Sequence, residues 1–394
     1  MTPNDRWILP DGIDEALPEK ARWLESARRK LIDLYSSWGY DLVMPPLIEY
    51  LDSLLTGTGS DLDLQTFKIT DQISGRMMGV RADMTPQVAR IDANRLQSEV
   101  PSRLCYIGTV LNTRPKGLSG SRSPIQVGAE LYGHAGYASD REILLLLLET
   151  LKTCGIEAVH LDLGHAGIYR DISASAGLSD EQTDALFEML QRKAVPEIDT
   201  WLNQLDLAEE AKTGLSALAM LNGDVSVIKR ARDVLKFGGD NVVLHLDQLE
   251  KLGKMVEQHY PQAKLNYDLA ELSGYHYETG VVYTAYVSGE GREVARGGRY
   301  DGIGKFFGKS RPAVGFSVDL KILQQLSQVD FASHAGLIWA PATDDADLTT
   351  EITKLRDMGE RVVTALDGQA GPHELGCTRR LVNQGGQWAV QEIE

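Results

Sequence analysis

The sequence predicts an α+β protein in which helices flank an antiparallel sheet. Strand-like runs alternate with amphipathic helices, and two of the runs form a hairpin with a long connection. No Gly-x-Gly-x-x-Gly sequence follows a strand, and no Walker A sequence occurs, so nothing indicates a doubly wound nucleotide-binding sheet. With 394 residues, the chain is long enough for about two or three domains.

The elements of the first half follow from apolar periodicity and from turn residues. The first helix has Pro18 in its first turn and Gly39 after its end, and a double proline stops the extended run that follows. Ser139 and Glu142 have the spacing of a capping box at the start of a leucine-rich helix. The predicted elements are helices at 18–38, 85–97 and 139–154, an extended run at 40–46, and strands at 66–70, 76–81, 103–111 and 125–133.

The second half changes character twice. Residues 179–260 are almost wholly helical, and we interpret 175–262 as a helical insertion in a core of residues 1–326. Strand character returns after the insertion. Residues 327–394 are predicted to form a small C-terminal α/β domain. The further elements predicted here are a strand at 159–163, strand character at 274–287, a strand and helix in 312–326, strands at 337–339 and 361–365, and a helix at 347–358.

The composition argues against several classes of protein. The chain has 40 Lys and Arg against 56 Asp and Glu, a net charge of −16, which disfavours broad nucleic-acid binding. Three widely spaced cysteines indicate neither a disulfide framework nor a metal site, and a reducing cytoplasm is the expected location. No apolar run is long enough for a membrane span, and no signal peptide is visible. His160, Asp162 and His165 are close in sequence but are weak evidence for a metal.

The strand at 125–133 carries a candidate ligand site. Gln126, Gly128, Glu130 and Tyr132 alternate along it and therefore share one face. A glycine between an amide and a carboxylate leaves an open polar floor that suits a small cationic or amino-bearing ligand. The alternative is a solvent-facing strand surface, which the spacing alone favours because half-exposed strands are common.

Two other segments combine glycine with tyrosine or arginine. In 296–302, adjacent glycines that include Gly298 permit a close approach of the backbone to a ligand, although a β-bulge with a surface arginine explains them equally well. In 274–280, Tyr275 and Tyr277 share a strand face and could form the wall of a small pocket.

Taken in order, these segments resemble the catalytic core of class II aminoacyl-tRNA synthetases, and specifically of histidyl-tRNA synthetases, over residues 5–326. The resemblance implies the class II antiparallel sheet. It rests on 39–48, which is similar to the dimerisation motif 1, on 81–85, which is similar to the amino-acid-binding stretch, and on 104–130 and 313–317, which are similar to motifs 2 and 3. The two histidine signatures correspond to 274–280 and 297–302.

Three positions depart from the synthetase pattern. Asn112 and Ile322 stand where the family has arginines that bind ATP, and Ser273 replaces an arginine beside the reacting carboxylate. Amino-acid activation needs positioned cations, and the loss of one such donor typically costs ~10²–10³ in rate. Arg114 lies near Asn112 and could replace only one of the three. The resemblance therefore implies a chain that does not activate an amino acid.

The amino-acid-binding positions are retained. By the resemblance, Asp83, Thr85, Gln126, Glu130 and Tyr277 hold histidine, and Tyr275 and Gly298 lie beside them. Glu130 would accept the ammonium or imidazole end, and Gln126 would orient the ligand. Asp83 is usually a glutamate in the synthetases, and Glu278 stands where a second tyrosine is usual.

This combination resembles the regulatory subunits of short-form ATP phosphoribosyltransferase, most closely in 122–133 and 272–277. The resemblance implies a non-catalytic chain without cofactor or metal. Such a chain activates a separate catalytic subunit at the first step of histidine biosynthesis and relays inhibition by L-histidine. It forms a dimer within a hetero-octamer and does not bind tRNA, consistent with a tail of only 59 residues, 336–394. The alternatives are an active histidyl-tRNA synthetase and a free-standing amino-acid sensor.

Overall fold

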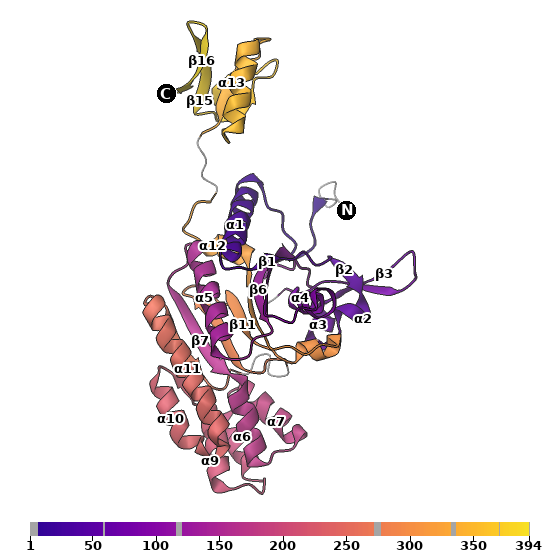
Figure 1. Ribbon diagram of the computed structural model, residues 1–394, viewed down its shortest axis with the longest axis vertical. Helices are drawn as coiled ribbons and strands as arrows, with labels where there is room; N and C mark the ends of the chain where they lie inside the picture. Colours follow the sequence, from indigo (N-terminus) through magenta and orange to yellow (C-terminus); the bar gives the residue numbers. More distant parts are fainter. Residues whose placement is uncertain are drawn as a thin grey trace. The chain divides into compact units, whose positions relative to one another are not determined.

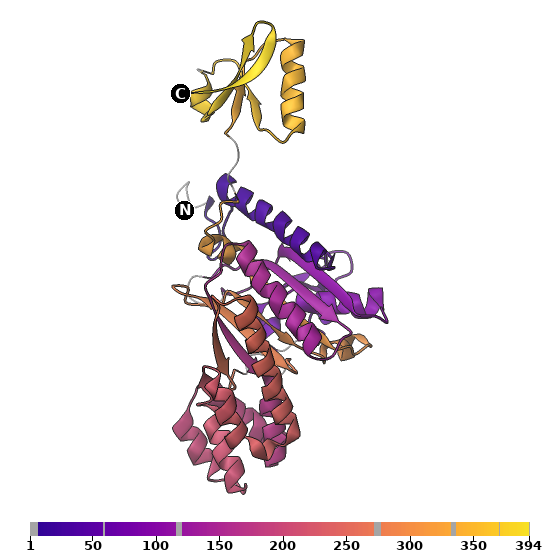
Figure 2. The same ribbon diagram turned by 60° about the vertical axis from the view of Figure 1, so that its left-hand side comes forward.

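The computed structural model describes residues 7–57, 60–115, 120–271, 277–331, 336–369 and 371–393. The chain divides into two compact units, residues 1–331 and 332–394, and each has a sheet of its own (Figures 1 and 2). Within those described ranges, no helix combines the length and the apolar character that crossing a membrane requires.

The first unit is built on a nine-stranded sheet. Neighbouring strands are antiparallel from β5 to β7, while β1 on β5 and β9 on β7 are parallel, so the sheet is mixed with an antiparallel centre. The predicted fold class is confirmed. In spatial order the strands are β1 (Asp41–Leu42), β5 (Ser102–Thr109), β6 (Ile125–Tyr132), β12 (Ala313–Asp319), β11 (Ala295–Arg299), β10 (Val281–Val287), β7 (Val159–His165), β9 (Lys264–Asp268) and β8 (Asn222–Gly223).

Helices cover one face of this sheet. Helix α5 (Tyr137–Thr153) packs against the central strands and also contacts α1 (Pro18–Ser37) and α11 (Asp240–His259) (Figure 2). Its run Leu144–Leu148 is therefore buried all round rather than along one stripe. The apolar residues of the central strands face this layer, for example Phe316, whose ring contacts that of Tyr35. The polar residues of the same strands lie on the opposite face of the sheet.

The beginning of α5 differs from the prediction. The helix begins at Tyr137 after Gly136, and no side chain caps it, so the capping box predicted for Ser139 and Glu142 is wrong. Ser139 is instead inside the first turn and nearly fully buried. A capping box does occur at Ser179, where Ser179 and Gln182 bond reciprocally with the backbone.

The helical insertion follows β7 and gathers at one end of the sheet (Figure 1). Strand β8 interrupts the helices and joins the sheet edge, which the sequence pattern does not predict. The helices before α11 are α6 (Ala166–Ala176), α7 (Asp180–Gln191), α8 (Val195–Leu202), α9 (Glu209–Leu218), α10 (Ser226–Val234) and the 3₁₀ turn η3 (Lys236–Gly238).

A small three-stranded sheet accompanies the core. It has the order β2 (Ile48–Tyr50), β4 (Met77–Val80), β3 (Phe67–Thr70), and the strands predicted at 66–70 and 76–81 pair here as antiparallel neighbours. The remaining elements of the first unit are α2 (Leu51–Leu54), α3 (Ser60–Gln65), α4 (Thr85–Ile91), the π-helical turn η2 (Asp92–Leu96), the 3₁₀ turn η4 (Ile303–Phe307) and α12 (Leu320–Leu326).

The second unit contains a hairpin that the sequence analysis did not predict. Strands β13 (Ile338–Ala340) and β14 (Val362–Thr364) and helix α13 (Ala346–Asp357) lie where they were expected. The hairpin consists of β15 (Arg379–Gln384) and β16 (Gln387–Glu392), and the 3₁₀ turn η5 (Pro372–Leu375) precedes it. Gly385 and Gly386 between the strands have φ of 63° and 92°, so this Gly-Gly pair was the missed signal of a tight hairpin turn.

Candidate functional site

The polar face of the large sheet carries the candidate site. Gln126, Gly128, Glu130 and Tyr132 of β6 point to this face, away from the helical layer, and Glu130 and Tyr132 are buried. A solvent-facing strand surface, the alternative that the spacing favoured, is therefore wrong. The fold therefore buries much of this face inside the protein.

Glu130 lies at the centre of that face. Its side chain is 1% exposed, the Tyr106 hydroxyl donates to Oε1 at 2.9 Å, and the Tyr300 hydroxyl donates to Oε2. Burial is the main cause that raises the pKa of Glu130 to about 8, although both tyrosine hydroxyls act to lower it. At neutral pH the carboxyl group therefore holds its proton and avoids a buried unpaired charge.

Two glycines make room for buried carboxyl groups. Strand register places Glu130 opposite Gly315, and Gly315 opposite Gly298. A Cβ on Gly315 would lie 1.4 Å from Oε2 of Glu130. A Cβ on Gly298 would lie 3.1 Å from Oε1 of Glu278 and 2.8 Å from a backbone oxygen. The predicted close approach at Gly298 is thus explained by packing of the protein's own carboxyl group.

A second polar group adjoins Glu130. The Gln126 amide donates to Oδ1 of Asp83 at 2.7 Å, and the backbone N–H of Thr85 donates to the same oxygen at 3.0 Å. The Gln126 carbonyl in turn accepts from the backbone N–H of Met84 at 2.9 Å. Thr85 Oγ1 lies 3.1 Å from the Tyr106 hydroxyl, which connects this group to Glu130. The structure thus brings four predicted residues, Asp83, Thr85, Gln126 and Glu130, into one network.

Tyr277 forms the wall of the site. Its ring stacks on Tyr300 with centroids 5.0 Å apart, and its buried hydroxyl has no hydrogen-bond partner among the described residues. A buried hydroxyl without a partner is costly, so it is a group that a ligand could satisfy. Tyr275 and Ser273 lie outside the described residues. We call Asp83, Thr85, Tyr106, Gln126, Glu130, Tyr277 and Tyr300 the Glu130 site.

Glu278, next to Tyr277, has a buried carboxyl group. Its side chain is 7% exposed, and within the part of the chain that the structure describes Oε2 has no hydrogen-bond partner. Burial is the main cause that raises the pKa of Glu278 to about 8, while Arg296 acts to lower it. Glu278 is therefore a second buried carboxyl group that is mostly protonated at neutral pH.

A cavity of about 410 Å³ adjoins the Glu130 site. Asp83 and Gln126 line it on the side of the site, and Asn112 and Ile322 line it further away. Asn112 is 2% exposed, and its Oδ1 has no hydrogen-bond partner in the described ranges. The two positions at which the resemblance noted missing arginines therefore face the same cavity, and neither supplies a cation to it.

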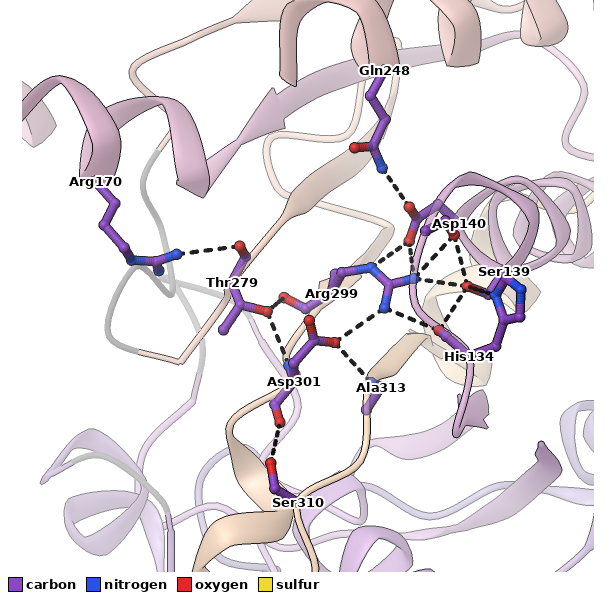
Figure 3. A network of polar contacts seen from close by, with 11 residues as sticks. His134, Ser139, Asp140, Arg170, Gln248, Thr279, Arg299, Asp301, Ser310 and Ala313 are labelled. Carbon is purple, nitrogen blue, oxygen red and sulfur yellow. Dashed lines mark hydrogen bonds and ion pairs between the residues drawn. The ribbon is translucent and has the colours of Figure 1, made fainter. Parts of the chain in front are cut away.

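An arginine behind the site connects the sheet to the helices (Figure 3). Arg299 lies between Gly298 and Tyr300 in sequence, and its guanidinium donates to Oδ1 of Asp140 at 2.6 and 2.8 Å. It also donates to Ser139 Oγ at 2.8 Å. Asp140 is fully buried and accepts a further bond from Gln248 of α11. This network explains why Ser139 and Asp140 do not cap their helix.

Helix α6, which leads into the insertion, contacts the wall of the site from the other side. Arg170 of α6 donates to the backbone oxygen of Glu278 at 3.0 Å. It also donates to the backbone oxygen of Thr279 at 3.3 Å (Figure 3). Both acceptors directly follow Tyr277. His165, by contrast, stacks on His245 at 4.0 Å and caps α6, and burial is the main cause that lowers its pKa to about 3. His165 therefore has a structural role.

The sequence analysis missed two residues of the site. Tyr300 lies in the segment 296–302 that was singled out, but it was not chosen as a ligand contact. Tyr106 had no local signal, because its role depends on its pairing with Gly128 across the hairpin. A Cβ on Gly128 would lie 2.4 Å from the Tyr106 hydroxyl, so this glycine makes room for the tyrosine ring.

A mixed sheet with a buried glutamate, a long-looped hairpin and a helical insertion defines a histidyl-tRNA-synthetase-like protein. The sequence matches the family described as histidyl-tRNA synthetase over residues 12–323. It matches the ATP phosphoribosyltransferase subunit HisZ C-terminal domain over residues 335–391. Histidyl-tRNA synthetases and ATP phosphoribosyltransferase subunits thus share this class. Relatives that match over the full length indicate which of the two this chain resembles.

Two relatives of high identity that span the whole chain carry the same name. An ATP phosphoribosyltransferase regulatory subunit from Thioalkalivibrio sulfidiphilus is 56% identical, with 100% of both chains covered. One from Alkalilimnicola ehrlichii is 52% identical over 100% of this chain and 99% of its own. This chain belongs to the family of ATP phosphoribosyltransferase regulatory subunits.

A solved structure agrees with this family. It is described as an ATP phosphoribosyltransferase regulatory subunit/histidyl-tRNA synthetase from Bacillus halodurans, and it is 25% identical to this chain. The TM-score is 0.80, and the match covers 94% of this chain and 95% of that one.

Proposed function

We propose that this chain activates a short-form ATP phosphoribosyltransferase catalytic subunit and makes that subunit sensitive to histidine, at the first step of histidine biosynthesis. The observation that carries the proposal is the contrast between two neighbouring spaces. The Glu130 site is fully built, whereas the adjoining cavity has Asn112 and Ile322 where a synthetase needs phosphate-binding cations. A chain of this kind recognises an amino acid without activating it.

We propose histidine as the ligand of the Glu130 site. The Glu130 carboxyl and the unpartnered Tyr277 hydroxyl suit the imidazole ring, which can donate and accept hydrogen bonds. Asp83 and Gln126 suit the α-amino group, because Asp83 offers carboxylate oxygen beside the cavity. Thr85 links Asp83 and Gln126 to Glu130 through Tyr106. Gly298 has an indirect role, because it makes room for Glu278. Tyr275 stays a predicted contact and lies outside the described residues.

The test is the rate of phosphoribosyl-ATP formation by a short-form catalytic subunit, with and without this chain, and with histidine added to each. We expect a clear rise on adding this chain and a loss of that rise on adding histidine. No effect of the chain would contradict the proposal. A rise that histidine does not reverse would contradict the proposed ligand alone.

The Glu130→Gln variant tests the pocket within that assay. We expect it to activate the catalytic subunit while histidine inhibition is weakened by at least about tenfold, since a glutamine amide accepts at one oxygen only and cannot keep both tyrosine hydrogen bonds that position the group. Glu142→Gln is the matched control, because Glu142 pairs with Arg103 away from the site. Unchanged inhibition in Glu130→Gln would reject the pocket assignment.

We propose that this chain pairs with itself through the three-stranded sheet and β1, as a dimer within a hetero-octamer. Large apolar side chains are exposed there, with Met44 75%, Ile73 97% and Leu47 50% exposed. Such a patch is typical of a protein interface. Light scattering should report a dimer for the wild type and a monomer for Met44→Glu. A Met44→Glu variant that stays dimeric would contradict this interface.

We propose that tRNA is not a partner and that the chain works in the cytoplasm. The net charge of −16 leaves little basic surface for a nucleic acid. Histidine-dependent exchange between pyrophosphate and ATP should be absent. Measurable exchange would instead favour an active histidyl-tRNA synthetase.

A further inference from the structure

A second cavity, of about 400 Å³, lies next to the first. The two spaces share several lining residues, among them Ser121 and Ile322, so they adjoin. Gln126, which faces the Glu130 site, lines the first cavity but not the second. Lys20 and Lys321 line the second cavity. Two ammonium groups therefore lie beyond the first cavity, where an anion could meet them.

The carboxyl group of Asp14 lies between these lysines. Lys321 Nζ donates to Oδ1 of Asp14 at 2.7 Å, and Lys20 Nζ donates to Oδ2 at 3.2 Å. Ser121 Oγ donates to Oδ1 at 3.0 Å. Burial acts to raise the pKa of Asp14, but the bonds from Lys321 and Lys20 outweigh it and lower the pKa to about 2, so the group is ionised at neutral pH. We call Lys20, Ser121 and Lys321 the lysine site.

Asp14 belongs to an N-terminal segment, residues 11–14, that lies against the long connection between β5 and β6. The backbone N–H of Arg122 donates to the Gly12 oxygen at 2.7 Å, and Arg122 Nη1 donates to the Asp11 oxygen at 3.1 Å. Gly12 has a φ of 75°, and a Cβ there would lie 2.9 Å from Arg122 Cγ. The segment thus has an anchor of its own, which holds the Asp14 carboxyl at the lysine site.

The lysine site is assembled from three parts of the chain. Lys20 belongs to α1, Ser121 to the connection between β5 and β6, and Lys321 to α12, where its side chain is only 10% exposed. Ammonium groups and a hydroxyl suit a phosphate group as well as a carboxylate. A group on a short tether has an effective concentration on the order of millimolar. A free anion must therefore displace Asp14 before it can bind the lysines.

We infer that the Asp14 carboxylate is a built-in anion that occupies the lysine site and keeps phosphate-bearing molecules out of it. The contact is autoinhibitory, because the chain blocks its own cations. Asn112 and Ile322 supply no cation to the first cavity, and Asp14 neutralises the lysines of the second. The inference goes beyond the proposed function and does not depend on it, because the lysine site shares no residue with the Glu130 site.

The test is calorimetric binding of inorganic pyrophosphate to the full chain at one pH and one ionic strength. We expect Asp14→Ala to bind pyrophosphate at least about tenfold more tightly than the wild type, because the tethered competitor is gone. Adding Lys321→Gln to Asp14→Ala should remove most of this gain, since Lys321 is the more buried of the two lysines. Equal affinity of the wild type and Asp14→Ala would overturn the inference.

Asp11→Ala is the matched control. It removes the same charge three residues earlier, and Arg122 contacts Asp11 through the backbone oxygen, so its pyrophosphate affinity should equal that of the wild type. An equal gain in Asp11→Ala, or a gain that survives Lys321→Gln, would place the effect outside the lysine site and overturn the inference. Should Asp14→Ala fail to fold by circular dichroism, Asp14→Asn removes the charge at nearly the same size and should show the gain.

Discussion

Glu130 and Glu278 show how single residues adapt to burial in this protein. Each is a carboxyl group with a pKa raised to about 8, and for each the main cause is loss of water. They differ in their partners, because two tyrosine hydroxyls bond Glu130, whereas Oε2 of Glu278 has no partner among the residues that the structure describes. Holding a proton at neutral pH removes the cost of a buried charge in both cases.

Both groups should make the chain less stable as the pH rises. Their folded-state pKa values of about 8 lie above the ordinary value of 4.5, so the folded chain binds more protons than the unfolded chain between about pH 5 and 8. The free energy of unfolding therefore falls across this window, by up to about 1.4 kcal/mol per pH unit for each group.

Urea unfolding at several pH values between 5 and 8.5 checks this expectation. In Glu130→Gln, the free energy of unfolding should fall less steeply with pH, because the contribution of Glu130 is gone. Glu142→Gln should leave the slope unchanged, because the pKa of Glu142 is lowered and the group is ionised throughout this range. An equal slope in the wild type and in Glu130→Gln would contradict the burial of an uncharged Glu130.

Gly315→Ala should displace the Glu130 carboxyl. A Cβ at position 315 would meet Oε2 at 1.4 Å, so Glu130 must move from its two tyrosine partners. We expect histidine affinity to fall by at least about tenfold. Gly302→Ala is the control, since nothing lies within 4 Å of its Cβ position and its φ of −80° suits alanine. Calorimetry on both variants decides, and equal affinities would be incompatible with the packing described.

At the scale of elements, β11 connects the site to the helical layers. Three consecutive residues of this segment contact three different parts of the molecule. Gly298 packs against the buried carboxyl of Glu278, Arg299 bonds the start of α5, and Tyr300 bonds Glu130. Asp140 of α5 also accepts a hydrogen bond from Gln248 of α11, so one carboxylate joins a strand and two helices (Figure 3). Movement of any of these elements would therefore change the others.

Asp140→Ala should be strongly destabilising. It leaves the Arg299 guanidinium buried without its main partner, and breaking a buried ion pair from one side costs about 3–5 kcal/mol. The double variant Asp140→Ala with Arg299→Ala should cost less than the sum of the two single variants. Urea unfolding of the four proteins measures this coupling. Additive losses would show that the pair acts as two independent contacts.

At the scale of the whole molecule, the chain consists of two units with separate cores. The second unit packs Ile338, Leu348 and Leu381 around its own sheet, with Trp388 beside them. All described residues of the Glu130 site belong to the first unit. We propose domain boundaries of 1–326, with the insertion at 175–262, and 327–394.

A chain that ends after residue 331 should therefore still bind histidine. The site keeps every described contact, and only the second unit is lost. Calorimetry on the shortened and full chains should report affinities within about threefold of each other, less than the loss of one hydrogen bond. A loss of binding in a folded shortened chain, judged by circular dichroism, would show that the second unit takes part in the site.

The sequence by itself determined the fold class, most elements and the family. Apolar periods of 3.6 and 2 depend only on neighbours along the chain, so helices such as α1 and strands such as β6 could be predicted. The order of short motifs also identified Asp83, Gln126 and Glu130 as one site. The hairpin β15–β16 was predictable from Gly385-Gly386, and its omission was an oversight of a local signal.

Only the tertiary structure decided which groups share a space. Tyr106 and Tyr300 meet Glu130 because strand register aligns them, and register depends on partners far apart in sequence. Ser139 has the spacing of a cap, yet a bond to Arg299, 160 residues away, outweighs that local preference. Burial, which raises the pKa of Glu130 and Glu278, likewise exists only once the sheet has assembled.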